Sequence, residues 1–446
     1  MRLRNIVAGA NASIYYRLDF EKIKRVFYPE NEEDVRDAIS YARKHEYDVT
    51  PKGAGSGLSG ACTGGNRGRV IISTLRMNKI LDVSTEQGYV DVHPGTTPDE
   101  INALLEPKDM KFWVAPSSRD VATVGGILNT DGGGNDTWVN GTMRDNTLRV
   151  EMMLYDGREI SVDKDGVESE DPELQRQLNN KGLTIDDIAS SHGTLGFITQ
   201  LRVAVRPFPD EELIGALVEY ENYDRMGKTI HEMISRNSPI RYGESIIMAH
   251  KDIRENLSPP LQILEFPEHY AEELGEITDY RQLDSAELEQ LKDTRIKLPK
   301  RNPKEGTQLA LFEGYGLHDD SLLNMEQSIE HINEVLREHD LIPFAKYGHA
   351  PSKWYMGNNK PAYGIIMHSR EIRPKGQSSE DIFETVLALV DRCKELGITP
   401  KPEHKWPFAD KDKKKRITEL RKIMGRGFNS FILAKDCATS TLRTMV

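Results

Sequence analysis

The stretch that decides the fold is Pro51-Lys52-Gly53-Ala54-Gly55-Ser56-Gly57-Leu58-Ser59-Gly60. Four of its last eight residues are glycine, and small or hydroxylated residues stand between most of them. Such a loop can turn its backbone N–H groups toward one point and let a large anion approach closely. The stretch therefore predicts a bound phosphate group, and so a nucleotide or nucleotide cofactor. An ordinary glycine-rich turn is the alternative.

Part of this loop, Gly55-x-Gly57-x-x-Gly60, matches the dinucleotide fingerprint G-x-G-x-x-G. That fingerprint needs a strand before it and a helix that opens on its last glycine. A strand over 47–51 is plausible, but the turn-rich segment 63–68 and the β-branched run 70–72 follow in place of a helix. The context argues against a Rossmann fold and predicts that the phosphate lies on a loop between strands.

The bulk composition limits the class of protein. The length of 446 residues predicts two or three domains, and 29% charged with 37% hydrophobic residues is typical of a soluble globular protein. A net charge of −12 gives no support for binding nucleic acid or an anionic membrane. The three cysteines form no C-x-x-C pair, which excludes a disulfide scaffold, a cysteine zinc site and an iron–sulfur cluster held by this chain alone. Neither a signal peptide nor a membrane span is evident, so a cytoplasmic location is expected.

Helix and strand patterns alternate along the first half of the chain. Helices are predicted at 30–46 and 97–105, and strands at 70–73, 88–93, 150–154, 159–162 and 198–205. Pro207 and Pro209 predict a domain boundary. In the second half we expect strands at 213–220 and 309–315 and helices at 224–235, 321–338 and 379–396. Residues 251–305 are expected to be a solvated helical excursion, and the basic run 411–416 an exposed helix face rather than an interaction patch.

Two further clusters of small residues follow the first loop. Pro116-Ser117-Ser118 precedes the segment 122–134, which is dense in glycine and hydroxyl groups and is interpreted as lacking residues to fill a core. Its hydroxyls, and the N–H groups of Gly125 and Gly126, are predicted to face a ligand. The third cluster, 190–199, leads into a strand. Three such loops in one domain predict a long ligand across several strand ends, for which a dinucleotide is suited.

In their order and in their residues the three clusters resemble the motifs of the FAD-linked oxidases. These have an FAD domain of the vanillyl-alcohol-oxidase or cresol-methylhydroxylase type. The likeness lies in P-x-G-x-G-S-G-L-S-G, P-S-S with A-T-V-G-G, and S-H-G-T-L-G-F-I-T, and is strong over about residues 22–208. Within this group the chain is most similar to the D-type subunit of glycolate oxidase and to the D-lactate and D-2-hydroxyglutarate dehydrogenases. The resemblance implies an α+β fold: an FAD-binding domain of two α+β subdomains and an α+β cap, or substrate, domain with an antiparallel sheet. The expected divisions are 1–208, 209–400 and a segment 401–446 that returns toward the FAD domain.

The resemblance also implies which residues contact FAD. The first loop would hold the pyrophosphate, the second would continue toward the flavin, and the third would lie near the adenine–ribose end and the flavin. The residues so implied are Pro51, Lys52, Gly53, Ala54, Gly55, Ser56, Gly57, Leu58 and Ser59, then Pro116, Ser117, Ser118, Thr123, Gly125, Gly126 and Asn129, then Gly193, Thr194, Gly196 and Ile198. Because Ser56 stands nearest the histidine that bonds to flavin in some relatives, non-covalent FAD is expected.

The resemblance is weaker in the second half. Glu403-His404 matches an E-H motif of the family, which implies that His404, with Glu403, takes the hydroxyl proton of the substrate. Tyr347-Gly348-His349 resembles the start of G-H-x-G-D-G-N, but the rest of that motif is missing. His349, His368 and Glu403 are ligand types suited to Zn, Mn or Fe, so a divalent metal is left open. Arg241, Arg370, Arg373 and Lys405 are candidates to hold a substrate carboxylate.

Three functions remain open from the sequence. The first is an FAD-dependent dehydrogenase of a small D-2-hydroxy acid such as lactate or glycolate, which passes electrons to a quinone, an electron-transfer protein or an iron–sulfur partner. The second is a non-redox transferase like alkyl-dihydroxyacetone-phosphate synthase. The third is an electron-transfer protein with a degraded substrate site. A homodimer and peripheral attachment to a membrane through a partner are left open, whereas nucleic acid and a transmembrane segment are not expected.

Overall fold

The structure is a computed structural model, and its described residues divide into two compact units. They are residues 21–57, 61–62, 67–249, 258–297, 307–352, 362–372, 388–389, 391–393, 395–400 and 411–429. The first unit lies within 1–133, 142–208 and 402–446, and the second within 134–141 and 209–401. The second unit thus takes in a short segment, Gly134–Gly141, that the sequence analysis placed in the FAD domain.

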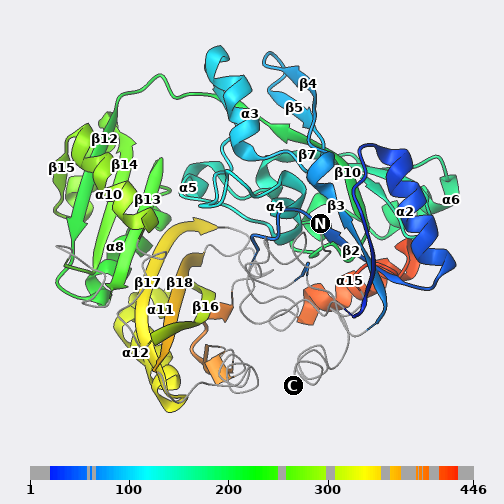
Figure 1. Cartoon of the computed structure of the whole chain (residues 1–446). Helices are drawn as coiled ribbons and strands as arrows, with labels where there is room; N and C mark the ends of the chain where they lie inside the picture. Colours follow the sequence, from blue (N-terminus) through cyan, green and yellow to red (C-terminus); the bar gives the residue numbers. More distant parts are fainter. Residues whose placement is uncertain are drawn as a thin grey trace. The chain divides into compact units, whose positions relative to one another are not determined.

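The first unit begins with a small parallel sheet covered by a helix (Figure 1). The strand order is β1-β3-β2, with β1 at Ile23–Phe27, β2 at Asp48–Lys52 and β3 at Arg69–Ser73. Helix α2 (Glu32–Lys44) is capped by the Asn31 side chain and buries one apolar face, as its sequence pattern predicts. The sheet directs β2 straight into the first glycine loop.

A six-stranded antiparallel sheet completes the first unit, in the order β4-β5-β10-β7-β8-β9. Its strands are β4 (Ile80–Ser84), β5 (Tyr89–Val92), β7 (Thr147–Met153), β8 (Glu159–Asp163), β9 (Gly166–Glu168) and β10 (Phe197–Ala204). The helices are α3 (Pro98–Leu105), α4 (Val124–Thr130), α6 (Pro172–Asn180), α7 (Ile185–Ile188) and α15 (Lys411–Met424), with short 3₁₀ turns η1 (Thr74–Arg76), η2 (Glu106–Lys108) and η3 (Arg144–Asn146). The short strands β6 (Met110–Lys111) and β11 (Arg206–Pro207) pair with each other.

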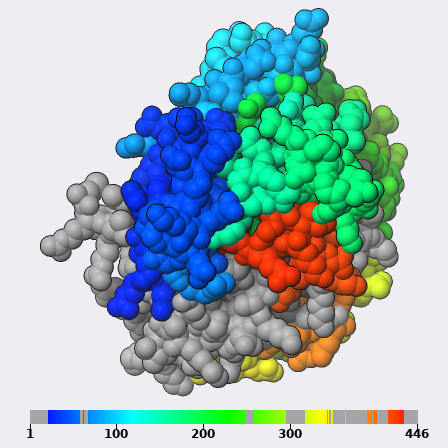
Figure 2. Space-filling view, turned by 90° about the vertical axis from the view of Figure 1, so that its right-hand side faces the viewer, coloured from blue at the N-terminus to red at the C-terminus, as the bar shows by residue number. Residues whose placement is uncertain are grey.

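Two expectations about the first unit are wrong. The second glycine cluster does fill a core, because Val124, Ile127 and Leu128 of α4 are buried in the main apolar cluster of the unit. The basic run on α15 is not simply an exposed face, because Arg416 donates to Asp187 and Lys413 donates to the carbonyl of Asp186. On the face shown in Figure 2, the red surface of this C-terminal helix lies against the green surface that belongs to the same unit.

The second unit is built on an eight-stranded sheet in the order β15-β12-β14-β13-β17-β18-β16-β19, whose pairings are all antiparallel. Its strands are β12 (Leu213–Glu219), β13 (Tyr242–Ala249), β14 (Leu261–Pro267), β15 (Arg281–Leu283), β16 (Thr307–Leu317), β17 (Leu341–Ser352), β18 (Ala362–Ile372) and β19 (Thr399–Pro400). The helical elements are α5 (Thr137–Asn140), α8 (Tyr223–Ser235), η4 (Glu268–Tyr270), α9 (Ala271–Ile277), α10 (Ser285–Lys297), α11 (Asp319–Leu323) and α12 (Met325–Glu338).

The expectation of a solvated helical excursion at 251–305 holds for α9 and α10 but is wrong for β14. Strand β14 lies inside the sheet between β12 and β13, and its Leu261, Ile263 and Phe266 side chains are buried. Helix α10 covers this part of the sheet through Leu288, which fits over Gly215 of β12. The strand itself reads L-Q-I-L-E-F-P and is buried at every position but Glu265, so the polar look of the segment comes from the charged residues of α9 and α10. Of the helix predicted at 379–396, only part lies within the described residues, and that part is helical up to residue 395.

Candidate functional site

The first glycine loop leaves the end of β2 and has almost no room for side chains at its start. A Cβ atom on Gly53 would lie 2.2 Å from Oγ1 of Thr123, which is closer than any packed Cβ can tolerate. Among the described residues, the N–H groups of Gly53 to Gly57 donate to no backbone or side-chain acceptor. An anion placed here would satisfy them. Leu58 and Ser59, also predicted to contact the cofactor, lie outside the described residues.

The second cluster forms helix α4 and the turn before it. The prediction that Gly125 offers its N–H group to a ligand is wrong, because this group donates to the Pro94 carbonyl at 2.9 Å. The need for glycine is steric, since a Cβ on Gly125 would lie 2.7 Å from Cβ of Pro94. Pro116–Ser118 form a tight turn in which the Pro116 carbonyl accepts from the N–H of Arg119 at 2.9 Å, and the Ser118 carbonyl accepts from the N–H of Ala122 at 2.7 Å in the turn that follows. The cluster therefore packs α4 closely against the loop after β5.

Thr123, at the start of α4, has a buried hydroxyl beneath the first loop. Its side chain does not cap the helix, and among the described residues Oγ1 has no hydrogen-bond partner. The residue is 2% exposed, so water does not readily compensate for the missing bond. A buried hydroxyl without a partner costs about 1–3 kcal/mol. Its position against Gly53, and 3.1 Å from a Cβ on Gly126, aims this unsatisfied group at the place where the loops meet.

The third cluster follows α7 and is held to α4 by Asn129. Oδ1 of Asn129 accepts from the N–H of Gly193 at 2.9 Å and from Oγ of Ser191 at 3.2 Å, and its Nδ2 donates to the Gly125 carbonyl at 3.0 Å. The Asn129 carbonyl accepts from the N–H of His192 at 2.8 Å. The side chain that the resemblance assigns to cofactor contact thus joins the second loop to the third, a role that no spacing in the sequence signals.

Left-handed backbone shapes the third loop. Ser190, His192 and Gly193 have φ values of 59°, 53° and 68°, a region that glycine adopts freely and other residues rarely do. The hydroxyl of Thr194 donates a hydrogen bond within the loop, to the Ser191 carbonyl at 2.7 Å. Gly196 lets the chain pass Met152 closely, and Ile198 is buried in the core at the start of β10. These residues shape the loop, and the Thr194 hydroxyl and the Gly193 N–H are already engaged within the protein.

The three loops converge. Gly53 of the first lies against Thr123 of the second, and Asn129 of the second holds Gly193 of the third. A Cβ on Gly193 would in turn lie 3.3 Å from Cγ of Pro51, at the entrance to the first loop. Segments that are far apart in the sequence therefore meet at one place, as the sequence predicts for a long ligand.

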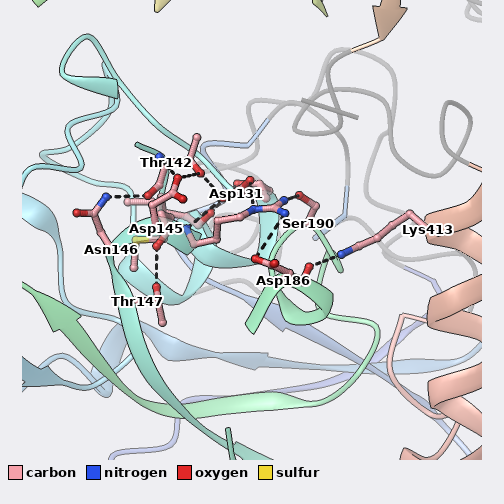
Figure 3. A network of polar contacts seen from close by, with 12 residues as sticks. Asp131, Thr142, Asp145, Asn146, Thr147, Asp186, Ser190 and Lys413 are labelled. Atoms are coloured by element: carbon pink, nitrogen blue, oxygen red, sulfur yellow. Dashed lines mark hydrogen bonds and ion pairs between the residues drawn. The ribbon is translucent and has the colours of Figure 1, made fainter. Parts of the chain in front are cut away.

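A buried ion pair supports this place from behind (Figure 3). Asp131, in left-handed conformation after α4, accepts from the N–H of Arg144 at 3.1 Å, from its Nε at 2.7 Å and from the Thr142 hydroxyl at 2.8 Å. Arg144 also donates to the hydroxyl of Ser190 at 3.3 Å, at the start of the third loop. Its side chain is only 10% exposed, so this is a structural clamp rather than a free cation. Arg144 of η3 thus clamps the second loop to the third.

The C-terminal segment supplies a residue that sequence reasoning missed. Nδ2 of Asn429 donates to the His192 carbonyl at 2.8 Å, and a Cβ on Gly193 would lie 3.4 Å from this nitrogen. Asn429 follows directly on Phe428, which forms a parallel bridge with Val49 of β2. No glycine cluster or periodic pattern marks this position. Its buried polar side chain beside two ligand loops is visible only in three dimensions.

The predicted catalytic and metal residues are placed only in part. Glu403 and His404 lie outside the described residues, as do Arg373 and Lys405, and of His349 and His368 the backbone alone is described. Within β17 and β18, position 345 pairs with 368 and position 349 pairs with 364. The two histidines are thus offset by four residues, about 13 Å of strand, which does not favour one shared ion. Among the described residues no group of three or more His, Cys, Asp or Glu side chains could hold a metal.

Arg241, one candidate for a substrate carboxylate, is already engaged. Its guanidinium donates to Oε1 of Glu211 at 2.6 Å, and the side chain is 26% exposed. A carboxylate in this position competes with any substrate anion. The structure therefore favours the other candidates over Arg241.

The residues present fit FAD. The unengaged N–H groups of the first loop can bind a pyrophosphate, and the buried Thr123 hydroxyl and Asn429 amide offer hydrogen bonds to it or to neighbouring polar groups of the cofactor. The glycines that line the meeting point leave space where a side chain would stand. No described helix is long and apolar enough to cross a membrane.

Comparison with known proteins agrees with this geometry. Residues 23–163 match the family model described as FAD binding domain. The chain is 23% identical over 427 residues to glycolate oxidase subunit GlcD of Bacillus subtilis (strain 168), a match that covers 91% of this chain and 86% of that protein. It is 26% identical over 245 residues to D-2-hydroxyglutarate dehydrogenase of Escherichia coli (strain K12), covering 45% of this chain and only 24% of that protein.

Two further likenesses extend the comparison. The chain is 26% identical over 215 residues to a probable mitochondrial D-lactate dehydrogenase of Danio rerio, covering 48% of this chain and 41% of that protein. Among solved structures, an alkyldihydroxyacetonephosphate synthase superposes with a TM-score of 0.66 at 15% identity, over 90% of this chain and 74% of the other. At that identity the likeness shows the fold alone.

Proposed function

We propose that this chain, whose residues 23–163 belong to the FAD-binding domain family, oxidises a small D-2-hydroxy acid of the lactate or glycolate kind to the 2-oxo acid. The observation that carries the proposal is the convergence of three loops on one site in the first unit. The relative that matches along 91% of this chain is named as a subunit of glycolate oxidase. Lactate has a secondary alcohol and glycolate a primary alcohol next to the carboxylate. In both acids the alcohol is the group to be oxidised.

Bound FAD would supply the acceptor for the hydride that leaves the alcohol carbon. The chain's own part is to hold that cofactor without a covalent bond, since Ser56 stands nearest the position where some relatives have a histidine that bonds to flavin. Gly53–Gly57 would bind the pyrophosphate through their N–H groups, and Thr123 would donate its hydroxyl beside them. Asn129 and the Asp131–Arg144 clamp would keep the second and third loops in register around it.

The hydroxyl proton of the substrate needs a base of its own. We assign this role to His404, with Glu403 beside it, because a neutral histidine near its ordinary pKa suits proton abstraction at neutral pH. The carboxylate of the substrate needs a guanidinium or ammonium group, for which Arg370, Arg373 and Lys405 stay candidates. A divalent metal stays a prediction of the sequence alone.

The test is anaerobic reduction of the bound flavin. Purified holoprotein would be mixed with D-lactate, glycolate and D-2-hydroxyglutarate, with each L-enantiomer of the chiral acids as a matched control, while the visible absorbance of the flavin is followed. We expect at least one D-acid to bleach the flavin and its L-enantiomer to react far more slowly. No bleaching with any acid of the panel would overturn the proposal.

The base assignment has its own variants. His404→Asn should slow flavin reduction by about a hundredfold or more, since general-base catalysis contributes about that much. Its affinity for FAD should not change. The control is His45→Asn, at the exposed residue that follows the C-terminal end of α2. Its bound flavin should be reduced at the wild-type rate. Equal rates for His404→Asn and the control would remove His404 from the mechanism.

A second function, non-redox ether-lipid synthesis, is favoured by one observation. The solved structure of an alkyldihydroxyacetonephosphate synthase shares the fold over 90% of this chain. Ether-lipid synthesis by the purified protein, without flavin bleaching by any hydroxy acid, would establish this alternative. We place it second because a relative named as a glycolate oxidase subunit matches in sequence along 91% of this chain, whereas the synthase is only 15% identical.

A further inference from the structure

The C-terminal segment is built into the sheet that carries the first loop. The N–H of Val49 donates to the Gly427 carbonyl at 2.7 Å, and the N–H of Asn429 donates back to the Val49 carbonyl at 2.9 Å. Phe428, between them, is fully buried and meets the ring of Tyr155 edge-on at 5.9 Å. Position 429 is thus fixed by a backbone bond to Val49 of β2, and Val49 lies four residues before Gly53.

Helix α15 anchors this segment from the other side. Ile417, Leu420 and Met424 are buried in the main core of the first unit. Arg416 binds both carboxylate oxygens of Asp187, at 2.9 and 2.8 Å, and the carbonyls of Lys181 and Gly182. These contacts hold α15 against the turn that leads into the third loop.

The side chain of Asn429 is only half satisfied. Its Nδ2 donates to the His192 carbonyl, yet among the described residues its Oδ1 has no hydrogen-bond partner although the residue is 1% exposed. Its backbone has a φ of 39°, a conformation that asparagine tolerates better than most residues. An acceptor that is buried, unpaired and held in a rare conformation is a costly feature. A ligand donor would remove that cost.

The side-chain amide of Asn429 lies among the loops that are predicted to bind the cofactor. The amide lies beside Gly193, and Gly193 in turn lies beside Pro51, so the first loop, the third loop and the C-terminal segment meet here. FAD carries suitable donors in its ring N–H and in its ribose and ribityl hydroxyls. The other polar atom of the amide already fixes the third loop.

We propose that Asn429 is a further residue of the cofactor site, whose Nδ2 positions the third loop through His192 and whose Oδ1 accepts a hydrogen bond from bound FAD. The proposal rests on the FAD-binding part of the proposed function and not on the substrate. It makes the C-terminal segment, about 370 residues after the first loop, part of the same binding site. Loading the protein with FAD should therefore tighten α15 and the strand bridge at Val49.

The experiment compares FAD affinity in Asn429→Gly with that of the wild-type chain. Glycine accepts a φ of 39° without strain, so this substitution deletes the amide and leaves the backbone conformation accessible. Asn179→Ala is the matched control, because both polar atoms of that amide hold Val167 in the same unit, away from the loops. Affinity is measured by quenching of flavin fluorescence in apoprotein, beside the visible circular dichroism of the bound flavin and the melting temperature of the apoprotein.

We expect Asn429→Gly to bind FAD at least tenfold more weakly and to change the flavin dichroism, whereas Asn179→Ala lowers only the melting temperature. Wild-type affinity and dichroism in Asn429→Gly would overturn the proposal, whatever happens to its melting temperature. So would an equal loss of affinity in Asn179→Ala. If Asn429→Gly does not fold, hydrogen exchange of the wild-type chain replaces it: FAD should slow exchange of the Val49 and Asn429 amides, and unchanged exchange would overturn the proposal. Hydroxy acids take no part in this measurement, so a failure of the substrate proposal leaves its result unaffected.

Discussion

The glycines of the cofactor loops differ in what a side chain would do to them. At Gly53 and Gly125 a Cβ would collide with Thr123 or Pro94, whereas at Gly57 the nearest atom is 3.9 Å away. The glycine-rich pattern therefore combines two causes, close packing of the loops on each other and freedom to approach a ligand. Sequence alone cannot separate these causes, because glycine meets both requirements.

This difference predicts opposite outcomes for two alanine variants of the first loop. In Gly53→Ala the new methyl group must displace the buried Thr123 side chain, at a cost of about 1–3 kcal/mol. FAD affinity should fall at least tenfold. Gly57→Ala meets only an ordinary contact, so its apoprotein should keep the wild-type free energy of unfolding although the new methyl group lies where the ligand approaches. Urea unfolding of both apoproteins checks this, and equal free energies of unfolding would refute the packing argument.

The Thr123 hydroxyl should separate stability from binding. Thr123→Val removes a buried hydroxyl that has no partner among the described residues, so the apoprotein should gain about 1 kcal/mol in free energy of unfolding. The same change removes a donor for FAD, and affinity should fall about tenfold. Urea unfolding of the apoprotein and an FAD titration give the two numbers. A loss of apoprotein stability together with unchanged affinity would show that the hydroxyl is structural.

At the level of elements, α15 shows that a basic residue on a helix can bind a distant partner that the local sequence does not reveal. A run of lysines and arginines on a helix is most often solvated, and the sequence pattern predicts that here. Arg416, however, reaches Asp187 and two carbonyls of the segment before the third loop. Its partner lies 229 residues earlier in the chain, so no local pattern could reveal the pair.

A double-mutant cycle measures this contact. Arg416→Met and Asp187→Asn, singly and together, should give a coupling free energy of about 1–2 kcal/mol, because the pair is bidentate and Asp187 is only 11% exposed. The control cycle is Arg36 with Glu159, a single contact whose side chains are about half exposed, for which coupling should stay below about 1 kcal/mol. Urea unfolding supplies the free energies. Equal coupling in the two cycles would contradict the anchoring role of Arg416.

Strand β17 carries a buried cation whose effect depends on pH. Lys346 is fully buried in the second unit beside Asn333, and burial lowers its pKa from 10.5 to about 7, with Glu330 opposing and Arg337 adding to that shift. Between about pH 7 and pH 10.5 the unfolded chain holds a proton on this group that the folded chain does not. Folding stability should therefore rise with pH across that window.

Lys346→Met should abolish this dependence on pH. The wild-type urea midpoint is expected to increase between pH 7 and pH 9, and the variant midpoint to stay level over the same range. Lys292→Met on α10 is the control, because that lysine keeps a carboxylate partner in Glu265 at 3.4 Å and should leave the wild-type slope in place. A slope that survives in Lys346→Met would assign the effect to another group.

At the scale of the whole molecule, the parts that local patterns predict well are those that local physics determines. The amphipathic helix 30–46 and the strands of the first unit follow from periodicity, and the three glycine clusters do meet in space. Within the helical excursion expected at 251–305, α9 and α10 are helices, but residues 261–267 form the strand β14, which its pairing with β12 and β13 buries in the sheet. Gly125 and Asn129 stand in a predicted site but hold the loops together, and Asn429 has no signal at all. Side-chain partners, unlike elements, depend on contacts across the fold.

The central claim is that the three loops and the C-terminal segment hold one non-covalent FAD. The most direct measurement is the flavin content of the purified protein, before and after precipitation of the chain with acid. We predict one FAD per chain, released completely into the supernatant. Absence of flavin after incubation with FAD, or flavin that stays with the precipitated chain, would contradict this account.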